Sequence, residues 1–286
     1  MTKRLTTLLI AALTLGLLTG FGLAQRSWSE IQESGMVRVV TANEIPYGWI
    51  DDDGVAHGIA PEVAIAVLDS MGITDIEWTV TDFGSLIPSL IAGRADMTAA
   101  SMAILPDRCQ QVDYARPNSS YGEGFLVAAG NPQDIHSYQD FVDNPDLTLG
   151  IVSGADQIDF AQAMGIPQNQ ISFINANADA PSAVASGRVD AYAATGLTVA
   201  NLAGSSDRVE AADPFEDPIV DGAPVRSWGS FNFHADADDF REAFDAALGE
   251  FQETQEYRDI LLSHGLSDGD IDAALAASTE ELCTPE

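Results

Sequence analysis

Short runs of β-forming residues alternate with helical patterns along this 286-residue chain, which restricts the folds it can adopt. Between Val37 and Arg116, β-rich runs at 37–42 and 76–80 flank a helical run at 61–72, and a helix followed by a strand is expected over 84–100. Such alternation is typical of parallel strands joined by crossover helices. The sequence therefore predicts an α/β fold.

A second series of the same kind begins after Pro132. Helices are expected at 137–144 and from about Gln157, and strands at 147–152 and 171–175. The total length left after a short leader, roughly 260 residues, suits two domains better than one.

The two series also share a local pattern. The segment 182–194 (SAVASGRVDAYAA) repeats the order of 89–100 (SLIAGRADMTAA): a helix, then Gly-Arg, then a strand led by Asp. Two similar α/β lobes would produce this repeat. A glycine after a helix is common enough for coincidence to remain the alternative.

The N-terminus has the layout of an export signal. Two basic residues at 3–4 precede an apolar run over 8–18, and Gly-Leu-Ala at 22–24 offers a cleavage site. We expect a signal peptide over 1–24 and a periplasmic mature protein. A membrane anchor is the alternative, but the apolar run is shorter than the roughly 20 residues that a span needs.

The charge balance excludes some partners. The formal net charge is −32, and loss of Lys3 and Arg4 with the signal peptide would lower it to −34 and remove the only lysine. Binding to nucleic acid or anionic lipid depends on Lys and Arg, so we expect neither as a partner. Solubility in a salty habitat is the simplest explanation, because salt screens like-charge repulsion.

The chain contains two cysteines, Cys109 and Cys283. An exported protein permits a disulfide between them, and two unpaired thiols are the alternative. From about Ala235 onward the pattern is helical and acidic. If the disulfide forms, these C-terminal helices must return to the first lobe.

Five segments carry a resemblance to a known family. They are ANEIPYGW (42–49), DFGSLIPSLIAGRADM (82–97), LPDRC (105–109), GEGFLVAAGNP (122–132) and SGRVDAYAAT (186–195). They resemble the solute-binding proteins of amino-acid-type ABC importers, family 3, over nearly the whole mature chain. Within that family the chain is most similar to ectoine and hydroxyectoine binders, which share the Asn-Glu-x-Pro-aromatic motif, the Cys after Pro-x-Arg and a C-terminal Glu-x-Leu-Cys.

The resemblance implies a two-lobed periplasmic-binding-protein fold of type II. Its first lobe would span 25–126, its second 127–228, and residues 229–286 would return to the first lobe. The two crossings are expected near 124–129 and 227–233. Closure about the crossings would trap a ligand between the lobes.

The resemblance also implies binding roles. Arg108 matches the family's carboxylate-binding arginine, whose guanidinium fits a carboxylate bidentately; a surface ion pair with Asp107 or Asp113 is the alternative. Tyr47 and Phe83 match rings that face the ligand and can receive a delocalised cation, although a single aromatic residue is often a core residue. Ser101 and Gly154 are also expected at the ligand.

Glu44 follows the first expected strand, at the end where α/β folds place ligands. Its carboxylate could accept hydrogen bonds from a cationic amidine, and a helix-capping or solvated acid is the alternative.

Three positions depart from the family pattern. Thr195 stands where amino-acid binders place an Asp for the ligand ammonium, which favours a solute without one, such as ectoine. Ala103 stands where ectoine binders carry a third aromatic residue, and Trp228 or Trp49 could replace that ring.

Asp156 replaces a Gly or Thr that would face the ligand carboxylate. Two carboxylates repel, so either Asp156 turns away to cap the next helix or the ligand is more cationic than ectoine.

We therefore expect a monomeric binder that delivers a small zwitterion to the membrane permease of an ABC importer, with a polar or basic amino acid as the alternative ligand. We expect no cofactor, no metal and no catalysis, because the sequence lacks a nucleophilic triad, a metal-ligand cluster and a phosphate loop. An enzyme of the cyclohexadienyl dehydratase type, with Glu44 or Asp156 as the acid, and a sensor ectodomain remain alternatives.

Overall fold

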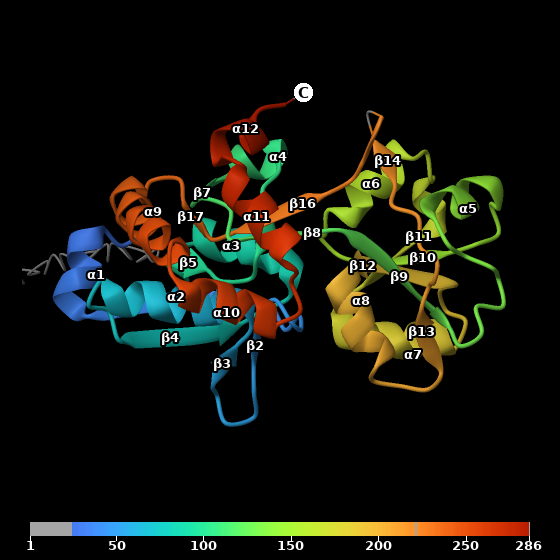
Figure 1. Ribbon diagram of the computed structural model, residues 1–286, viewed down its shortest axis with the longest axis horizontal. Helices are drawn as coiled ribbons and strands as arrows, with labels where there is room; N and C mark the ends of the chain where they lie inside the picture. The colour runs from blue at the N-terminus through green and yellow to red at the C-terminus, as the bar shows by residue number, and fades with distance from the viewer. Residues whose placement is uncertain (1–24, 221, 286) are drawn as a thin grey trace, which may run out of the picture.

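The computed structural model describes residues 25–220 and 222–285, so the expected signal peptide lies outside the described residues. These residues form two lobes, each built on one five-stranded mixed sheet (Figure 1). The α/β fold class is therefore confirmed.

The sheet of the first lobe has the order β4-β1-β5-β17-β7. β1 pairs in parallel with β4 and β5, whereas β17 is antiparallel to β5 and β7. Its strands are β1 (Met36–Thr41), β4 (Asp75–Val80), β5 (Met97–Thr98), β7 (Val112–Tyr114) and β17 (Asn232–His234). The lobe also contains helices α1 (Trp28–Ser34), α2 (Ile59–Ser70), η1 (Phe83–Ser85), α3 (Leu86–Ile91) and α4 (Pro106–Cys109), and the hairpin β2 (Trp49–Ile50) with β3 (Ala56–His57).

The sheet of the second lobe has the order β11-β10-β12-β9-β13. Its strands are β9 (Glu123–Ala128), β10 (Leu149–Val152), β11 (Ile171–Ile174), β12 (Ala191–Thr195) and β13 (Val209–Ala211). Its helices are α5 (Tyr138–Asp143), α6 (Gln157–Ala163), η2 (Gln168–Gln170), η3 (Asn177–Asp179), α7 (Ala180–Ala185) and α8 (Gly196–Ala203), and β14 (Ile219–Val220) pairs with β15 (Ala223–Pro224).

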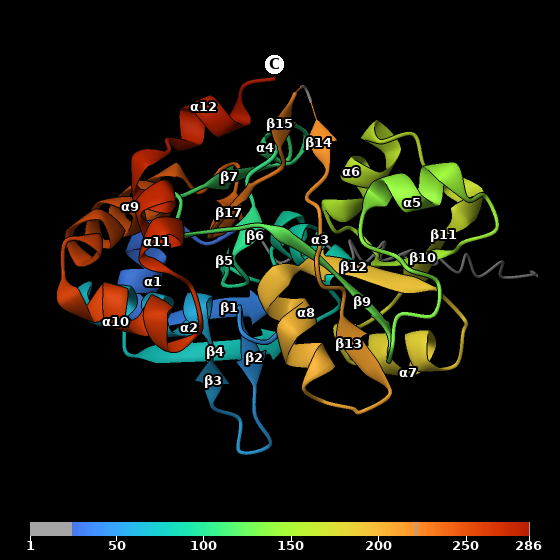
Figure 2. The ribbon, with the colours of Figure 1, turned by 45° about the vertical axis from the view of Figure 1, so that its right-hand side comes forward.

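Two crossings connect the lobes through a small antiparallel sheet of β6 (Met102–Ala103), β16 (Ser227–Ser230) and β8 (Ser119–Tyr121) (Figure 2). The first crossing passes from β8 to β9 at Gly122, because β9 pairs with β12 from Glu123 onward. The expected boundary after residue 126 therefore falls inside β9. On the return, β16 already pairs with β6 and β8 at residues 227–230.

The C-terminal helices lie on the first lobe (Figures 1 and 2). They are α9 (Asp238–Gln252), α10 (Gln255–Ser263), α11 (Asp268–Ala276) and α12 (Thr279–Cys283). Apolar residues of α9, among them Phe240 and Phe244, are fully buried in the same core as Val39 of β1. A disulfide joins Cys283 to Cys109 of α4, with 5.7 Å between the Cα atoms.

The repeated Gly-Arg-x-Asp pattern has the same structural role in both lobes. The backbone N–H of Asp96 donates to the carbonyl of Arg38, and its carboxylate accepts from the Arg38 N–H. Asp190 makes the same pair of contacts with Thr148. Each aspartate thus fixes the start of its strand beside the neighbouring strand.

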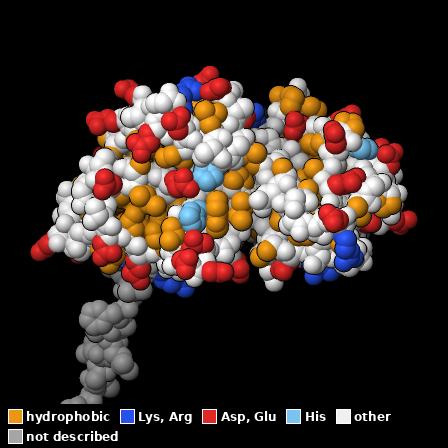
Figure 3. All heavy atoms as spheres, turned by 60° about the horizontal axis from the view of Figure 1, so that its bottom comes forward, with side chains coloured by type: hydrophobic (Ala, Val, Ile, Leu, Met, Phe, Trp, Pro, Cys, Tyr) orange, Lys and Arg blue, Asp and Glu red, His pale blue; other side chains and the backbone are white. Residues whose placement is uncertain are grey.

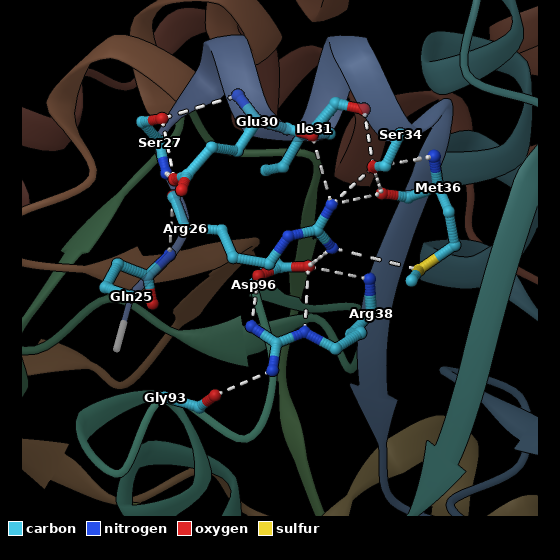
Figure 4. A network of polar contacts seen from close by, with 10 residues as sticks. All are labelled: Gln25, Arg26, Ser27, Glu30, Ile31, Ser34, Met36, Arg38, Gly93 and Asp96. Carbon is cyan, nitrogen blue, oxygen red and sulfur yellow. Dashed lines mark hydrogen bonds and ion pairs between the residues drawn. The ribbon is translucent and has the colours of Figure 1, made fainter. Parts of the chain in front are cut away.

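Asp96 additionally has two ion-pair partners, Arg26 and Arg38, with its side chain fully buried (Figure 4). Arg26 also donates to the carbonyl of Met36 at 3.1 Å. Through these contacts Asp96 holds the N-terminal segment of the described chain against the first sheet. A buried carboxylate is stable here because both positive charges and hydrogen bonds compensate it.

Many of the acidic side chains lie on the surface of the protein. On the face in Figure 3, Asp and Glu side chains are spread over both lobes, and Lys and Arg side chains are few. Within the described residues, no helix is long and apolar enough to cross a membrane.

Candidate functional site

A small cavity lies between the two lobes. Its wall combines residues from the carboxyl end of β1, from η1, from β8 and from the second sheet. The lining residues are Glu44, Tyr47, Phe83, Ala100, Ser101, Tyr121, Val152, Ala155, Asp156, Gln157, Asn177, Tyr192, Ala193, Ala194 and Thr195. Six expected ligand-binding residues therefore share one cavity: Glu44, Tyr47, Phe83, Ser101, Asp156 and Thr195.

Aromatic rings form much of the wall. The rings of Tyr47 and Tyr121 meet edge to face, with centroids 5.0 Å apart. The Tyr121 hydroxyl donates to the carbonyl of Ser101 at 2.9 Å, which holds that ring in place. Phe83 and Tyr192 also line the cavity. Such rings offer apolar area to a solute, and their faces attract a delocalised cation.

Glu44 lies just after β1 in a loop packed on the start of α2, where the carbonyls of Pro46 and Tyr47 accept from Ile59 and Ala60. Its Oε1 accepts a hydrogen bond from Thr198 Oγ1 at 2.8 Å. Burial raises the pKa of Glu44 to about 7, and the carboxylate of Asp156 adds to the rise. A cationic ligand would stabilise the ionised form of an acid whose pKa lies near neutral pH.

Asp156 precedes α6 and faces the cavity. Its Oδ2 accepts from Ser227 Oγ at 2.7 Å, and no side-chain capping bond joins it to α6. Of the two expectations for this residue, turning away to cap the helix does not occur in this structure. The carboxylate instead connects the second lobe to the second crossing.

Glu123 begins β9 at the first crossing and lies outside the cavity lining. Its Oε2 accepts from Nε2 of Gln157 at 2.8 Å, whereas its Oε1 is buried without a hydrogen-bond partner. Burial raises the pKa of Glu123 well above its ordinary value, and Asp156 and Glu44 add smaller electrostatic contributions. Sequence reasoning did not include Glu123 in the site.

Arg108 lies at the edge of the cavity, outside its lining. Its Nη1 donates to the carbonyl of Ala103 at 2.9 Å, and its Nη2 donates to the carbonyl of Gly154 at 2.8 Å. The guanidinium carbon is 5.8 Å from the ring centre of Phe83, which does line the cavity. Because a guanidinium has five N–H donors, these two bonds leave further N–H groups for a ligand.

Three other expected residues also lie outside the lining. Ala103 is buried in β6, where its carbonyl also accepts from the hydroxyl of Tyr114. Gly154 contributes its carbonyl to Arg108. Trp228 donates from its indole N–H to the carbonyl of Ala273 in α11. Ligand contact by these residues stays a prediction.

Trp49 was the other candidate to replace the third aromatic ring. It stacks on His57 with centroids 5.4 Å apart and does not line the cavity. In this structure the additional rings of the wall are those of Tyr121 and Tyr192.

Nine lining residues were not expected from the sequence, and four of these have polar or aromatic side chains: Tyr121, Gln157, Asn177 and Tyr192. The last two are tied together, since the Tyr192 hydroxyl donates to Oδ1 of Asn177. Tyr121 ends β8 next to the first crossing, and this position close to the expected ligand cleft could have identified it as a lining residue. Asn177, at the start of η3, and Tyr192, within β12, carry no such signal in the sequence.

The lobes touch each other around the cavity. A Cβ atom added to Gly84 would lie 2.9 Å from the carbonyl oxygen of Ser153, so two backbones from opposite lobes meet there. The Arg108–Gly154 and Thr198–Glu44 bonds also join the lobes. The structure therefore shows a closed arrangement, as expected of a protein that encloses its ligand.

One residue of the wall has an unusual backbone. Ser101 has φ of 45°, in the left-handed region that residues with a side chain rarely adopt, and its hydroxyl has no hydrogen-bond partner. Such conformations cluster at ligand-binding sites because the surrounding structure must hold them. Among the described residues, no group of three or more His, Cys, Asp or Glu is arranged to hold a metal ion.

The two-lobed fold with a closed cavity between its sheets defines a binding protein of the periplasmic type. Residues 37–267 match the family model of the bacterial extracellular solute-binding proteins, family 3, and the chain belongs to this family.

The chain is similar to one named periplasmic-binding protein and to one solved complex with a solute. The chain is 48% identical to the probable amino-acid ABC transporter periplasmic-binding protein y4tE of Sinorhizobium fredii (strain NBRC 101917 / NGR234), over 89% of this chain and 85% of that protein. The crystal structure of EhuB in complex with hydroxyectoine matches with a TM-score of 0.81 and 30% identity, covering 90% of this chain and 98% of that one. The chain is therefore a solute-binding protein of an amino-acid ABC transporter, as predicted, and its relatives are binding proteins.

A second solved structure supports the fold alone. The ancestral amino acid-binding protein AncCDT-1, a precursor of cyclohexadienyl dehydratase, matches with a TM-score of 0.71 at 24% identity, over 82% of this chain and 97% of that one.

Proposed function

We propose that this protein captures a small solute that combines a carboxylate with a delocalised cation, and delivers it as a monomer from the periplasm to the membrane permease of its importer. Ectoine and hydroxyectoine are the first candidates. The observation that carries the proposal is the position of Glu44 in an aromatic-walled cavity between the lobes, with Arg108 beside the Phe83 wall. The 30% identity with EhuB supports the choice of solute.

The cavity residues suggest how such a solute would be held. An amidinium would donate to Glu44 in a charge-assisted hydrogen bond, between the rings of Tyr47 and Phe83. A carboxylate at the opposite end would accept from the N–H groups of Arg108 that the carbonyls of Ala103 and Gly154 do not use. The solute would thus bridge the lobes and stabilise the closed arrangement.

A basic amino acid is the second candidate, and Asp156 is the observation that favours it. The Asp156 carboxylate lines the cavity and does not cap α6, so it adds negative charge where ectoine would bring no further positive group. A guanidinium in place of the amidinium would suit Glu44 equally well.

Isothermal titration calorimetry with ectoine, hydroxyectoine, glycine betaine, glutamine and arginine tests the proposal. The mature protein should be unfolded and refolded first, because refolding removes any solute carried over from the cell. We expect micromolar or tighter binding of ectoine and hydroxyectoine, or of arginine, with no measurable binding of glycine betaine, which lacks the delocalised cation. Tight binding of glutamine alone, or of nothing in the panel, would contradict the proposed class of solute.

A further inference from the structure

The C-terminal helix α11 lies against both crossings that connect the lobes (Figure 1). The crossings run side by side there, because β8 and β16 pair antiparallel with Trp228 opposite Ser120. Trp228 of β16 donates from its indole N–H to the carbonyl of Ala273 in α11 at 3.1 Å. Ser120 of β8 donates from its hydroxyl to the carbonyl of Asp270 in α11 at 2.8 Å. One helix therefore contacts both strands about which the lobes would move.

Arg226 adds a charged side chain to this contact. It directly precedes β16, where the chain returns from the second lobe. Its Nε and Nη2 donate to Oγ of Ser120 at 3.0 and 2.8 Å, and Nη2 also forms an ion pair with Oδ1 of Asp270. The other carboxylate oxygen of Asp270 accepts from the N–H and the hydroxyl of Ser267, in the capping box that begins α11. Ser120, Arg226 and Asp270 thus form a closed set of contacts, which we call the hinge network.

Helix α11 is fixed to the first lobe. Its residue Ile271 is fully buried in the same core as Val39 of β1. Arg258 of α10 forms ion pairs with Asp268 and Asp272 of α11, and the disulfide joins the following helix, α12, to α4. The hinge network therefore ties the start of β16 to a part of the first lobe that stays in place when the lobes separate.

The hinge network is formed in the closed arrangement, in which the lobes touch at Gly84 and Ser153. Opening would rotate the second lobe about the crossings, and residues at the ends of the connecting strands absorb such a change in backbone torsion angles. Arg226 is at one of these ends, and Gly122 is at another, between β8 and β9. A new backbone direction at Arg226 would carry its guanidinium away from Asp270, and a hydrogen bond weakens steeply once its geometry is lost.

We propose that the hinge network is a latch that stabilises the closed arrangement, so that Arg226 and Asp270 set the affinity for the solute without touching it. Neither residue, nor Ser120, is among those that line the cavity. The apparent affinity of a solute is proportional to the fraction of the protein in the arrangement that binds it. The latch therefore acts on every solute by the same factor, and the inference goes beyond the proposed function because it holds whichever solute is bound.

Arg226→Gln tests the latch, because it removes the charge and the forked donor. By titration calorimetry with ectoine, hydroxyectoine and arginine, every solute that binds the unmodified protein should bind about threefold to fivefold more weakly, as expected for loss of a partly exposed ion pair. The ratios between solutes should not change. Asp270→Asn, which keeps an oxygen for Ser267, should have the same effect, and the double variant should be no weaker than either single one, because both residues act through one contact.

The matched control is Arg258→Gln, which removes an arginine that pairs with α11 without touching a crossing. It should bind normally. Unchanged affinity in Arg226→Gln, or a loss confined to one solute, would overturn the latch. If no solute of the panel binds, the proposed function fails, and small-angle X-ray scattering of the refolded, solute-free proteins then decides the latch. A larger radius of gyration in Arg226→Gln than in Arg258→Gln and the unmodified protein would support it, and equal radii would overturn it.

Discussion

Arg108 makes two contacts, one to each lobe, through carbonyls rather than through an acidic side chain. This arrangement keeps its positive charge free for a ligand, because a carbonyl orients the guanidinium without neutralising it. The side chain can therefore serve in closure and in binding at the same time. Arg108 also lies beside Phe83, a residue of the cavity wall, so both its contact between the lobes and its free charge are located at the cavity.

Replacing Arg108 with Ala should weaken the binding of a carboxylate solute by at least about 2 kcal/mol, roughly thirtyfold, since a buried carboxylate loses its charged donor. Titration calorimetry measures the change. Arg188→Ala, which removes an exposed arginine from the second lobe, is the control and should bind normally. Unchanged affinity in Arg108→Ala would remove Arg108 from the binding site.

Glu44 should make binding dependent on pH. Its pKa of about 7 means that its ionised fraction falls about tenfold between pH 8 and pH 6. Affinity for a solute whose cation contacts Glu44 should fall by up to the same factor over that range. Glu44→Gln should bind more weakly at pH 8 and lose most of this dependence, and an equally steep profile in the variant would exclude Glu44 as the titrating group.

The raised pKa of Glu44 also makes the free energy of unfolding depend on pH. Because burial raises the pKa of Glu44 in the folded protein, the folded state holds a proton that the unfolded state releases between about pH 4.5 and 7. The contribution of Glu44 to the free energy of unfolding is therefore largest at low pH and falls as the pH rises through this window.

At the scale of elements, the close approach of η1 to the loop before α6 depends on glycine. The added Cβ at Gly84 would contact the Ser153 carbonyl only where the lobes meet, and no positive φ makes glycine necessary for the local backbone. A side chain at position 84 would therefore obstruct closure of the lobes, whereas the fold of the first lobe does not require glycine there.

Gly84→Ala should consequently weaken solute binding by about 1–3 kcal/mol, the usual cost of overpacking, and change thermal stability of the solute-free protein little. Calorimetry and thermal unfolding measure the two effects. Gly269→Ala is a matched control, because its added Cβ would have an ordinary contact 3.6 Å from Ser267 Oγ. Unchanged affinity in Gly84→Ala would show that the bound state does not need this backbone contact.

The Gly-Arg-x-Asp repeat shows what sequence patterns predict well at this scale. Asp96 and Asp190 make identical backbone contacts in the two lobes because helix, turn and strand are consecutive in the chain. The ion pairs of Asp96 with Arg26 and Arg38 were not predicted, since Arg26 is 70 residues away in the sequence.

Across the whole molecule, the disulfide between Cys109 and Cys283 closes a loop of 174 residues that contains the entire second lobe. It attaches α12 to α4, the helix that carries Arg108. The C-terminal helices, the first lobe and the edge of the cavity are thus connected covalently.

The double variant Cys109→Ser, Cys283→Ser should unfold with a free energy lower by about 5 kcal/mol in the chain-entropy model, because the unfolded chain is no longer cross-linked. Denaturant unfolding of the variant and of the unmodified protein, each with and without reductant, measures this difference. Reductant should lower the stability of the unmodified protein only. An equal unfolding midpoint in both oxidised proteins would contradict a stabilising role for the bond.

Local sequence was sufficient for the α/β class, the two lobes, the family and six of the cavity residues, because strand and helix periodicity, helix ends and family motifs are encoded within short segments. It could not predict that Tyr121 and Tyr192 complete the aromatic wall, or that Glu123 contacts Gln157 next to Asp156. Tyr121 ends β8 in the small sheet between the lobes and Tyr192 lies in β12 of the second lobe, so tertiary packing across the lobes brings these rings into one wall. Glu123 and Gln157 lie on different elements of the second lobe, 34 residues apart in the sequence. The direction of the Asp156 side chain was decided in the same way, because its partner Ser227 is 71 residues further along the chain, and a long-range contact of this kind leaves no periodic signal in the sequence.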